Sequence, residues 1–191
     1  KPDTAKKGNL FAAVGMTIAI VGTILFHQNI DHTTGEVSRI GNLPFIFGAI
    51  LIGTVIGYFA AMRVKMTAMP QMVSMFNGMG GACAALIGLV EMNTHHPVEF
   101  GHRMIIFLSV MIGTVSFAGS MIAYGKLEGK IKDIGSKLIQ VSNNTIFFAI
   151  LGSIVFLSMS GSWSDGFIWL IFAASAIYGI LFVMPIGGAD M

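Results

Sequence analysis

The chain has 191 residues, of which 54% are hydrophobic and only 10% are charged, and its mean hydropathy is +0.80. Soluble domains carry about 25% charged residues, so this composition indicates a protein of the lipid bilayer. The net charge of +2 is spread over several loops, which excludes a basic stripe that would bind a phosphate backbone, and no nucleic-acid partner is expected. The single cysteine, Cys83, excludes an intrachain disulfide.

Six apolar stretches are each long enough to cross a membrane as a helix, which takes about 17 to 25 residues. Backbone polar groups in hydrocarbon must be paired within their own segment, and no stretch alternates apolar and polar residues, so each is predicted to be helical. The expected spans are Leu10–Phe26, Leu43–Met62, Met69–Val90, Met104–Gly125, Asn144–Gly161 and Phe167–Gly187. The predicted fold is an all-α membrane protein, a bundle of six transmembrane helices within residues 1–191.

The basic residues distinguish the two sides of this bundle. Nine of the eleven Lys and Arg residues lie before the first span, after the second or after the fourth, and only Arg39 and Arg103 lie on the other side. By the positive-inside rule both termini and both basic loops are cytoplasmic. The basic loop "KLEGKIKDIGSK" at 126–137 is interpreted as a solvated connection.

The stretch "MFNGMGGACAALIGLVE" at 75–91 contains glycines spaced almost as in a dinucleotide-binding loop. Such a loop needs G-x-G-x-x-G between a strand and a helix, but Cys83 stands at the third position and no strand precedes, so nucleotide binding is disfavoured. Gly80, Ala84 and Gly88 recur instead at every fourth position. That spacing predicts a small-residue face on which a neighbouring helix packs closely.

An adjoining strip of the same helix carries Ser74, Asn77 and Gly81. A buried amide needs hydrogen-bond partners, so Asn77 is expected to point into the bundle rather than at lipid. Two interpretations stay open, a structural hydrogen bond to a neighbouring helix and a place on a polar path. In the second span Gly53 and Gly57 form a G-x-x-x-G pattern that indicates tight packing and no more.

The fourth span has a comparable polar strip. Ser109 with Gly113, and Ser116 with Ser120, stand at four-residue spacing, which places hydroxyls and small residues on one packing face. The alternative for each serine taken alone is a bond to its own backbone four residues earlier.

No Asp, Glu, Lys, Arg or His lies near the middle of any span, so a complete proton relay is not encoded in this chain. Three histidines and two glutamates gather in one outer loop, and either a metal site or solvated loop residues would account for them: His95, His96, His102, Glu91 and Glu99. Their spacing matches no zinc pattern, so no metal ligand is assigned. No nucleophile with a paired base is visible either.

The last seven residues, "PIGGADM", would end the sixth helix and hold a carboxylate at the membrane surface. Together with "RVKMTAMPQMVSMFNGMGG" at 63–81 and "GTVSFAGSMIAYGKLEGKI" at 113–131, the terminal "IGGADM" at 186–191 resembles the membrane domain of proton-translocating NAD(P) transhydrogenase, specifically its beta subunit. The order of these segments follows the family over nearly the whole chain.

The resemblance implies the membrane part of a proton pump that couples hydride transfer between NAD(H) and NADP(H) to proton translocation. The implied cofactors, NAD and NADP, bind outside this chain, which therefore has no hydride-transfer site of its own. The implied partners are an alpha subunit with an NAD-binding domain and membrane helices, and an NADP-binding domain of the beta subunit itself. The family also implies a dimer of protomers in a bacterial cytoplasmic membrane, with the mitochondrial inner membrane as the less favoured location.

The resemblance further implies that this chain is a piece of a longer polypeptide, with one helix before it and two helices and the NADP-binding domain after it. An alternative without hydride transfer is a secondary transporter, for which inverted repeats would be expected, yet the first and last three spans are not alike. Another alternative is a non-conducting assembly subunit, in which Asn77 and Ser120 would tolerate apolar replacement.

Site residues are carried over position by position. Asn77 falls where many members have histidine and others asparagine, and members with asparagine carry the membrane histidine on a partner helix. Ser120 matches a serine near the proton path. Asp190, with Gly187 and Gly188, matches the loop that contacts the NADP-binding domain.

The chain also departs from the family pattern. Ala68 and Gln71 stand where glutamates are common, so a role for acids there is not supported. Together with the resemblance, the sequence leads to two hypotheses. Asn77 and Ser120 order water beside a histidine of a partner subunit, and Asp190 senses the nucleotide domain electrostatically at the membrane surface.

Overall fold

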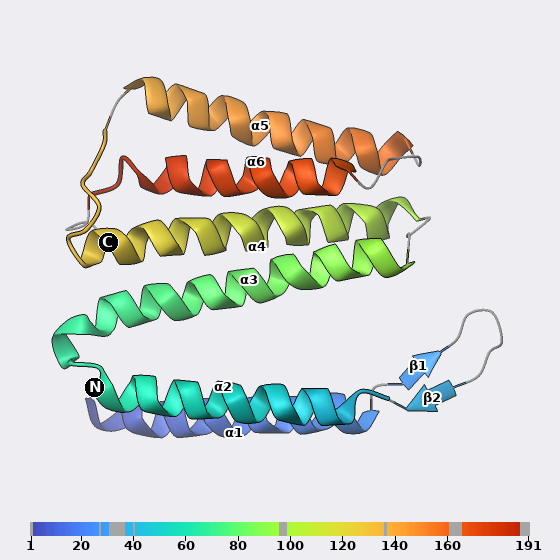
Figure 1. Cartoon of the computed structure of the whole chain (residues 1–191), viewed down its shortest axis with the longest axis vertical. Coiled ribbons are helices and arrows are strands. Elements are labelled where there is room, and N and C mark those ends of the chain that lie inside the picture. Colours follow the sequence, from blue (N-terminus) through green and yellow to red (C-terminus); the bar gives the residue numbers. More distant parts are fainter. Residues whose placement is uncertain are drawn as a thin grey trace. The chain divides into compact units, whose positions relative to one another are not determined.

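The computed structural model describes residues 2–26, 28–30, 37–39, 41–95, 99–135, 137–160 and 166–187. Within these ranges it contains six helices long and apolar enough to cross a membrane (Figure 1), which confirms the predicted number and class of spans. They are α1 (Pro2–Phe26), α2 (Leu43–Arg63), α3 (Met69–His95), α4 (Phe100–Leu127), α5 (Lys137–Ser160) and α6 (Gly166–Val183).

The structure differs from the sequence prediction in one connection and in several helix bounds, since α1, α4 and α5 begin earlier than predicted and α3 ends later. A short antiparallel hairpin joins α1 to α2, in which β1 (Gln28–Ile30) pairs with β2 (Val37–Arg39). At the other end of the chain, α6 ends at Val183 rather than at Gly187. Pro185 explains the earlier end, because proline has no N–H to donate and disfavours helical geometry in the residue before it.

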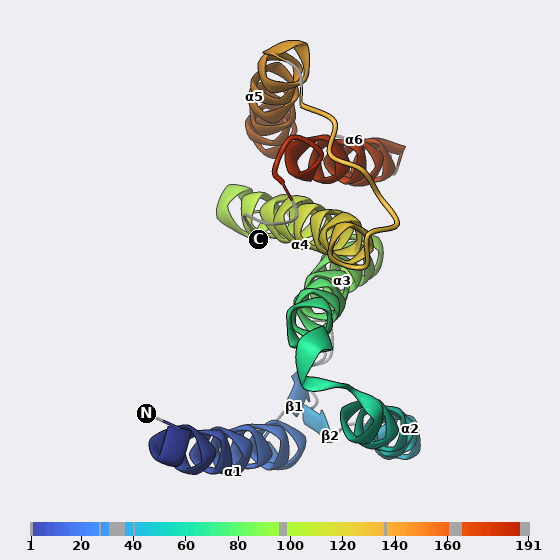
Figure 2. The same cartoon turned by 90° about the vertical axis from the view of Figure 1, so that its left-hand side faces the viewer.

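The chain divides into two compact units, residues 1–63 and 64–191. The first unit consists of α1, α2 and the hairpin, and the two helices diverge from the hairpin (Figure 2). No residue of α2 is buried among the described residues of the unit. A Cβ placed at Gly53 or Gly57 would meet no described atom within 4 Å. The G-x-x-x-G pattern of α2 therefore makes no helix contact in this unit.

In the second unit α3, α4, α6 and α5 lie side by side in that order, with α4 between α3 and α6 (Figures 1 and 2). The hydrophobic core forms around α4, where Phe107 and Val110 are fully buried against Ile154 of α5 and Ile168 of α6. A brief 3-10 turn, η1 (Met66–Ala68), leads into α3. The central position of α4 means that any site on α3 or α6 in this unit is built against it.

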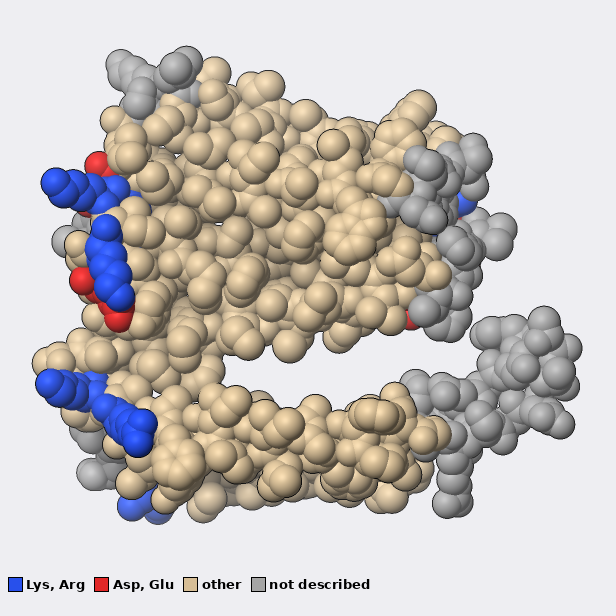
Figure 3. All heavy atoms as spheres, in the orientation of Figure 1, with Lys and Arg blue, Asp and Glu red and all other residues tan. Residues whose placement is uncertain are grey.

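Charge is confined to the ends of the helices. In the face that Figure 3 presents, the Lys, Arg, Asp and Glu side chains of the second unit lie at the helix ends, and a broad uncharged surface separates them. An uncharged band bounded by charged ends is what a hydrocarbon layer requires. This arrangement and the six apolar helices identify a multi-pass membrane protein.

Candidate functional site

Backbone contact holds α3 and α4 together at their middle. A Cβ on Gly113 would lie 2.5 Å from the backbone nitrogen of Ala85 and 2.6 Å from the carbonyl oxygen of Gly81. A Cβ on Gly81 would in turn lie 2.7 Å from the carbonyl oxygen of Gly113. Both positions therefore exclude any side chain, the condition under which two membrane helices approach most closely.

The backbone contact of Gly81 and Ala85 with Gly113, called the glycine seam below, differs from the small-residue face expected from the sequence. Gly88 contacts α4, since a Cβ there would lie 2.7 Å from Cγ2 of Val110, but a Cβ on Gly80 would meet no described atom within 4 Å. The packing face thus includes Gly81 and Ala85 rather than Gly80. Consecutive residues on a helix point about 100° apart, so a shift of one residue turns the face away from its neighbour.

One and two turns before Gly81 on α3, polar side chains take the place of glycines at the same interface. The Asn77 amide nitrogen donates to Ser120 Oγ at 3.0 Å and to Ser116 Oγ at 3.5 Å, both on α4. The Ser74 hydroxyl donates to the carbonyl oxygen of Ser120 at 2.7 Å. The structure therefore brings Asn77 and Ser120, two positions singled out in the sequence, into direct contact.

The expected four-residue pairing of serines is present in part. Ser116 and Ser120 both accept from Asn77. Ser109 does not bond its own helix, since its hydroxyl donates to the carbonyl oxygen of Ala84 on α3 at 3.0 Å. These hydroxyls thus connect helices.

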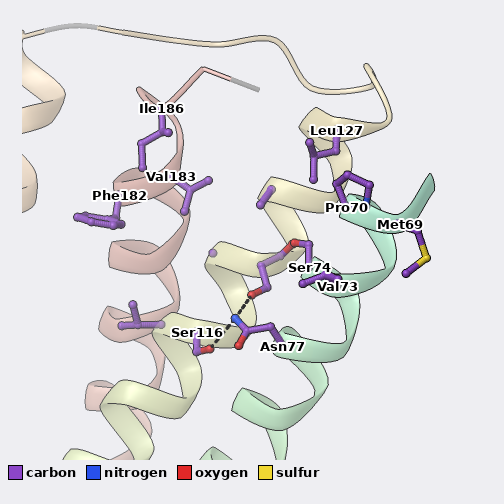
Figure 4. A pocket seen from close by; sticks show the side chains of 14 residues that line it. Met69, Pro70, Val73, Ser74, Asn77, Ser116, Leu127, Phe182, Val183 and Ile186 are labelled. Atoms are coloured by element: carbon purple, nitrogen blue, oxygen red, sulfur yellow. Dashed lines mark hydrogen bonds between the residues drawn. The ribbon is translucent and has the colours of Figure 1, made fainter. Parts of the chain in front are cut away.

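Asn77 lies at the edge of an open groove between α3, α4 and α6 (Figure 4). The groove has a volume of about 730 Å³ and its lining is largely apolar, with Val73 and Pro70 on α3 and Phe182 and Val183 on α6. Asn77 is directed at α4 and finds hydrogen-bond partners there, as expected, but the residue is exposed at the groove rather than buried. The amide instead bonds α4 with its nitrogen and borders the groove.

The chemistry that this groove offers is hydrogen bonding without charge. Its polar lining consists of one amide and three hydroxyls, from Asn77, Ser74, Ser116 and Ser120, and the residues that line it include no Asp, Glu, Lys, Arg or His. Both N–H groups of the amide are directed at serines, and its oxygen is an acceptor. Such groups hold water in a defined orientation, but they do not take up a proton at neutral pH.

The other predicted site residues lie at the chain end. Gly187 follows α6 and is partly buried, whereas Gly188 and Asp190 lie outside the described residues. Among the residues weighed as metal ligands, Nε2 of His102 lies 3.6 Å from Oε1 of Glu91. His96 lies outside the described residues. In the part of the chain that is described, no group of three His, Cys, Asp or Glu residues could hold a metal ion.

Sequence reasoning missed the polar contacts at the end of α4. Gln71 donates from its amide nitrogen to the carbonyl oxygen of Leu127 at 3.1 Å, and so caps α4 from α3. Lys126, interpreted as part of a solvated loop, is buried, with its side chain 1% exposed. Lys126 is the last residue but one of a long apolar helix. Basic side chains near a helix C-terminus can bond terminal carbonyls, so this position was the available sequence signal for a cap.

Comparison with known proteins gives one consistent result. Residues 1–191 match the family described as "NAD(P) transhydrogenase beta subunit". The chain is 30% identical over 200 residues to the NAD(P) transhydrogenase subunit beta of Rhodospirillum rubrum, and the match covers 100% of this chain and 40% of that protein. A second protein with the same name, from a defined strain of Rhodospirillum rubrum, matches to the same extent. The chain thus spans about 40% of the length of these relatives.

Proposed function

Because the chain belongs to the family of NAD(P) transhydrogenase beta subunits, we propose that it is the membrane part of a pump that couples hydride transfer between NAD(H) and NADP(H) to proton translocation. NAD binds on the alpha subunit and NADP on a further domain of the beta subunit, both outside this chain. The alpha subunit also contributes membrane helices, and the complex is a dimer of such protomers in the bacterial cytoplasmic membrane, with both termini of this chain on the cytoplasmic side.

The contact between Asn77 and Ser120 carries the proposal. It lies beside an open groove, next to the stretch of the interface where glycines bring the two backbones together. Gly81 and Gly113 leave no room for a side chain, so the amide and the hydroxyls lie where the groove opens. At the groove edge the amide oxygen and the hydroxyls of Ser116 and Ser120 are placed to bind water as well as each other.

The titrating group belongs to the partner in this proposal. A histidine on an alpha-subunit helix exchanges its proton with water held by the Asn77 oxygen and the serine hydroxyls. The amide accepts a hydrogen bond at its oxygen while it donates two from its nitrogen, so it keeps the water aligned without becoming charged. Asn77 and Ser120 are therefore path residues whose role is to orient water.

Coupling to the nucleotides runs through the segment after α6. Gly187, Gly188 and Asp190 are the positions that resemble the family's contact with the NADP-binding domain, and in this proposal the Asp190 carboxylate is the group that senses that domain. Normal NADP-linked proton movement in an Asp190→Asn variant would remove the carboxylate from this role.

The proposal is tested with inverted membrane vesicles that contain the complete alpha and beta subunits. Reduction of an NADP analogue by NADH is followed by absorbance, and proton movement is followed with a pH-sensitive dye. We expect the dye signal to follow hydride transfer and to vanish with a protonophore while the hydride transfer continues. Vesicles without the alpha subunit provide the control. Hydride transfer with no proton movement would contradict the pump, and no hydride transfer would contradict the enzyme.

A further inference from the structure

Lys126 reaches from the last turn of α4 to the end of α6. Its Nζ donates to the carbonyl oxygens of Met184 at 2.6 Å, Ile186 at 2.7 Å and Val183 at 3.1 Å. The fourth acceptor is Oδ1 of Asp133 at 2.8 Å. The lysine therefore binds three backbone carbonyls within about one turn at the point where α6 ends, together with one carboxylate.

The acceptors explain why a cation belongs at this position. The last carbonyls of a helix have no intrahelical donor, and the helix dipole concentrates negative charge there. An ammonium group has three N–H donors and no acceptor, so it suits a set of carbonyl oxygens that converge on one point. A lysine from one helix thus supplies the C-terminal cap of another.

The loop after α4 is folded to maintain this contact. A Cβ on Gly125 would lie 2.6 Å from Cδ1 of Ile131, so the glycine lets the Ile131 side chain pack directly against the end of α4. Gly129 has a φ of +72°, a conformation that glycine adopts without strain. The backbone N–H of Ile134 then donates to the carbonyl oxygen of Met184 at 3.2 Å.

The same end of α4 is connected to the groove. One residue after Lys126, the carbonyl oxygen of Leu127 accepts from Gln71 of α3, and Ser74, one turn later on α3, bonds the carbonyl oxygen of Ser120. On the other side, Ile186 is the residue immediately before Gly187. Lys126 thus connects α4, which carries Ser120 and contacts Asn77 of α3, to the start of the terminal segment at Gly187.

We propose that Lys126 is a positioning residue for coupling, an internal cation that fixes the end of α6, and hence the start of the segment at Gly187, relative to α4. This inference rests on the proposed function. A displacement of the terminal segment by the NADP-binding domain reaches the groove through the carbonyls that Lys126 holds. Without the ammonium, the segment moves independently of α4, and hydride transfer proceeds without its full proton movement.

The test measures protons moved per hydride transferred in inverted vesicles of the complete complex. Because the hydride-transfer site lies outside this chain, the ratio is compared between vesicles that hold equal amounts of assembled complex. We expect Lys126→Met to lower the ratio about tenfold, as the loss of a charge-assisted contact would do. The matched control is Lys130→Met in the same loop, where the exposed lysine bonds Glu128 and the ratio should stay native.

Hydrogen exchange at the end of α6 separates a positioning role from a structural one. We expect faster exchange of the Met184 and Ile186 amides, which are hydrogen-bonded at the end of α6, in Lys126→Met together with the lowered ratio. Faster exchange with a native ratio would reduce Lys126 to a structural cap and overturn the inference, and so would a native ratio with unchanged exchange. If Lys126→Met does not assemble, Lys126→Gln decides, since its amide has two N–H donors and carries no charge. A native ratio in that variant overturns the inference as well.

The two proposals fail in different ways. Absence of hydride transfer in the native complex would contradict the proposed function, and the role of Lys126 in coupling would be rejected with it. A native complex that couples normally, combined with a native ratio in Lys126→Met, would reject the role of Lys126 alone.

Discussion

The interface between α3 and α4 is built differently along its length. From Gly81 to Gly88 the two helices meet mainly through their backbones, with one side-chain bond from Ser109, whereas from Gln71 to Asn77 they meet through polar side chains beside an open groove. The closed half leaves no room for change, since a single methyl group at Gly113 would collide with two backbone atoms. The open half places hydrogen-bonding groups along the groove. One helix pair can thus combine a closely packed glycine seam with a polar groove.

The largest effect is expected in the closed half. Replacing Gly113 with alanine should destabilise the membrane domain by about 1 to 3 kcal/mol, because the helices must separate to admit the methyl group. Unfolding in detergent by a titrated denaturant measures this change. Gly80→Ala is the matched control, since a Cβ there meets no described atom within 4 Å. Equal stabilities of the two variants would show that the seam does not hold the helices together.

The next effect is expected in the open half and concerns coupling rather than stability. Ser120→Ala should lower the protons moved per hydride about fivefold, the factor equivalent to one neutral hydrogen bond of roughly 1 kcal/mol. Ser116→Ala should have a smaller effect, because its oxygen lies 3.5 Å from the Asn77 nitrogen against 3.0 Å for Ser120. A larger loss in Ser116→Ala would reverse this order and place the path elsewhere on α4.

The smallest effect is expected from the exposed charges after α4. Hydrogen bonds from Lys130, and then from Tyr124, lower the pKa of the Glu128 carboxyl below its ordinary value. Because the pKa is lower in the folded state, the resulting stability is present above the ordinary pKa of glutamate and is lost as the pH falls through the folded value. Thermal unfolding from neutral to acidic pH should therefore show a slight loss in the native protein that Glu128→Gln lacks. Identical pH profiles of the native protein and Glu128→Gln would contradict a stabilising contact between Glu128 and Lys130.

The helices were predictable because apolar length alone determines them in a membrane. The polar strip was predictable as a set of residues, and the structure joins Asn77 to Ser120. The sequence did not show whether Gly80 or Gly81 contacts α4, since spacing defines a helix face but not the neighbour that the face meets. The cap by Lys126 was missed because it depends on residues 57 to 60 positions apart that only the fold brings together. The early end of α6 follows instead from Pro185, which the predicted span had included.

The central claim is that Asn77 orders water on a proton path, and one substitution tests it directly. Asn77→Leu keeps a side chain of similar size and removes every hydrogen bond of the amide. Met79→Leu, an exposed position on α3 outside the groove lining, is the matched control. In inverted vesicles of the complete complex, we expect Asn77→Leu to continue hydride transfer while the dye reports little or no proton movement, and Met79→Leu to behave as native. Native proton movement in Asn77→Leu would contradict the account.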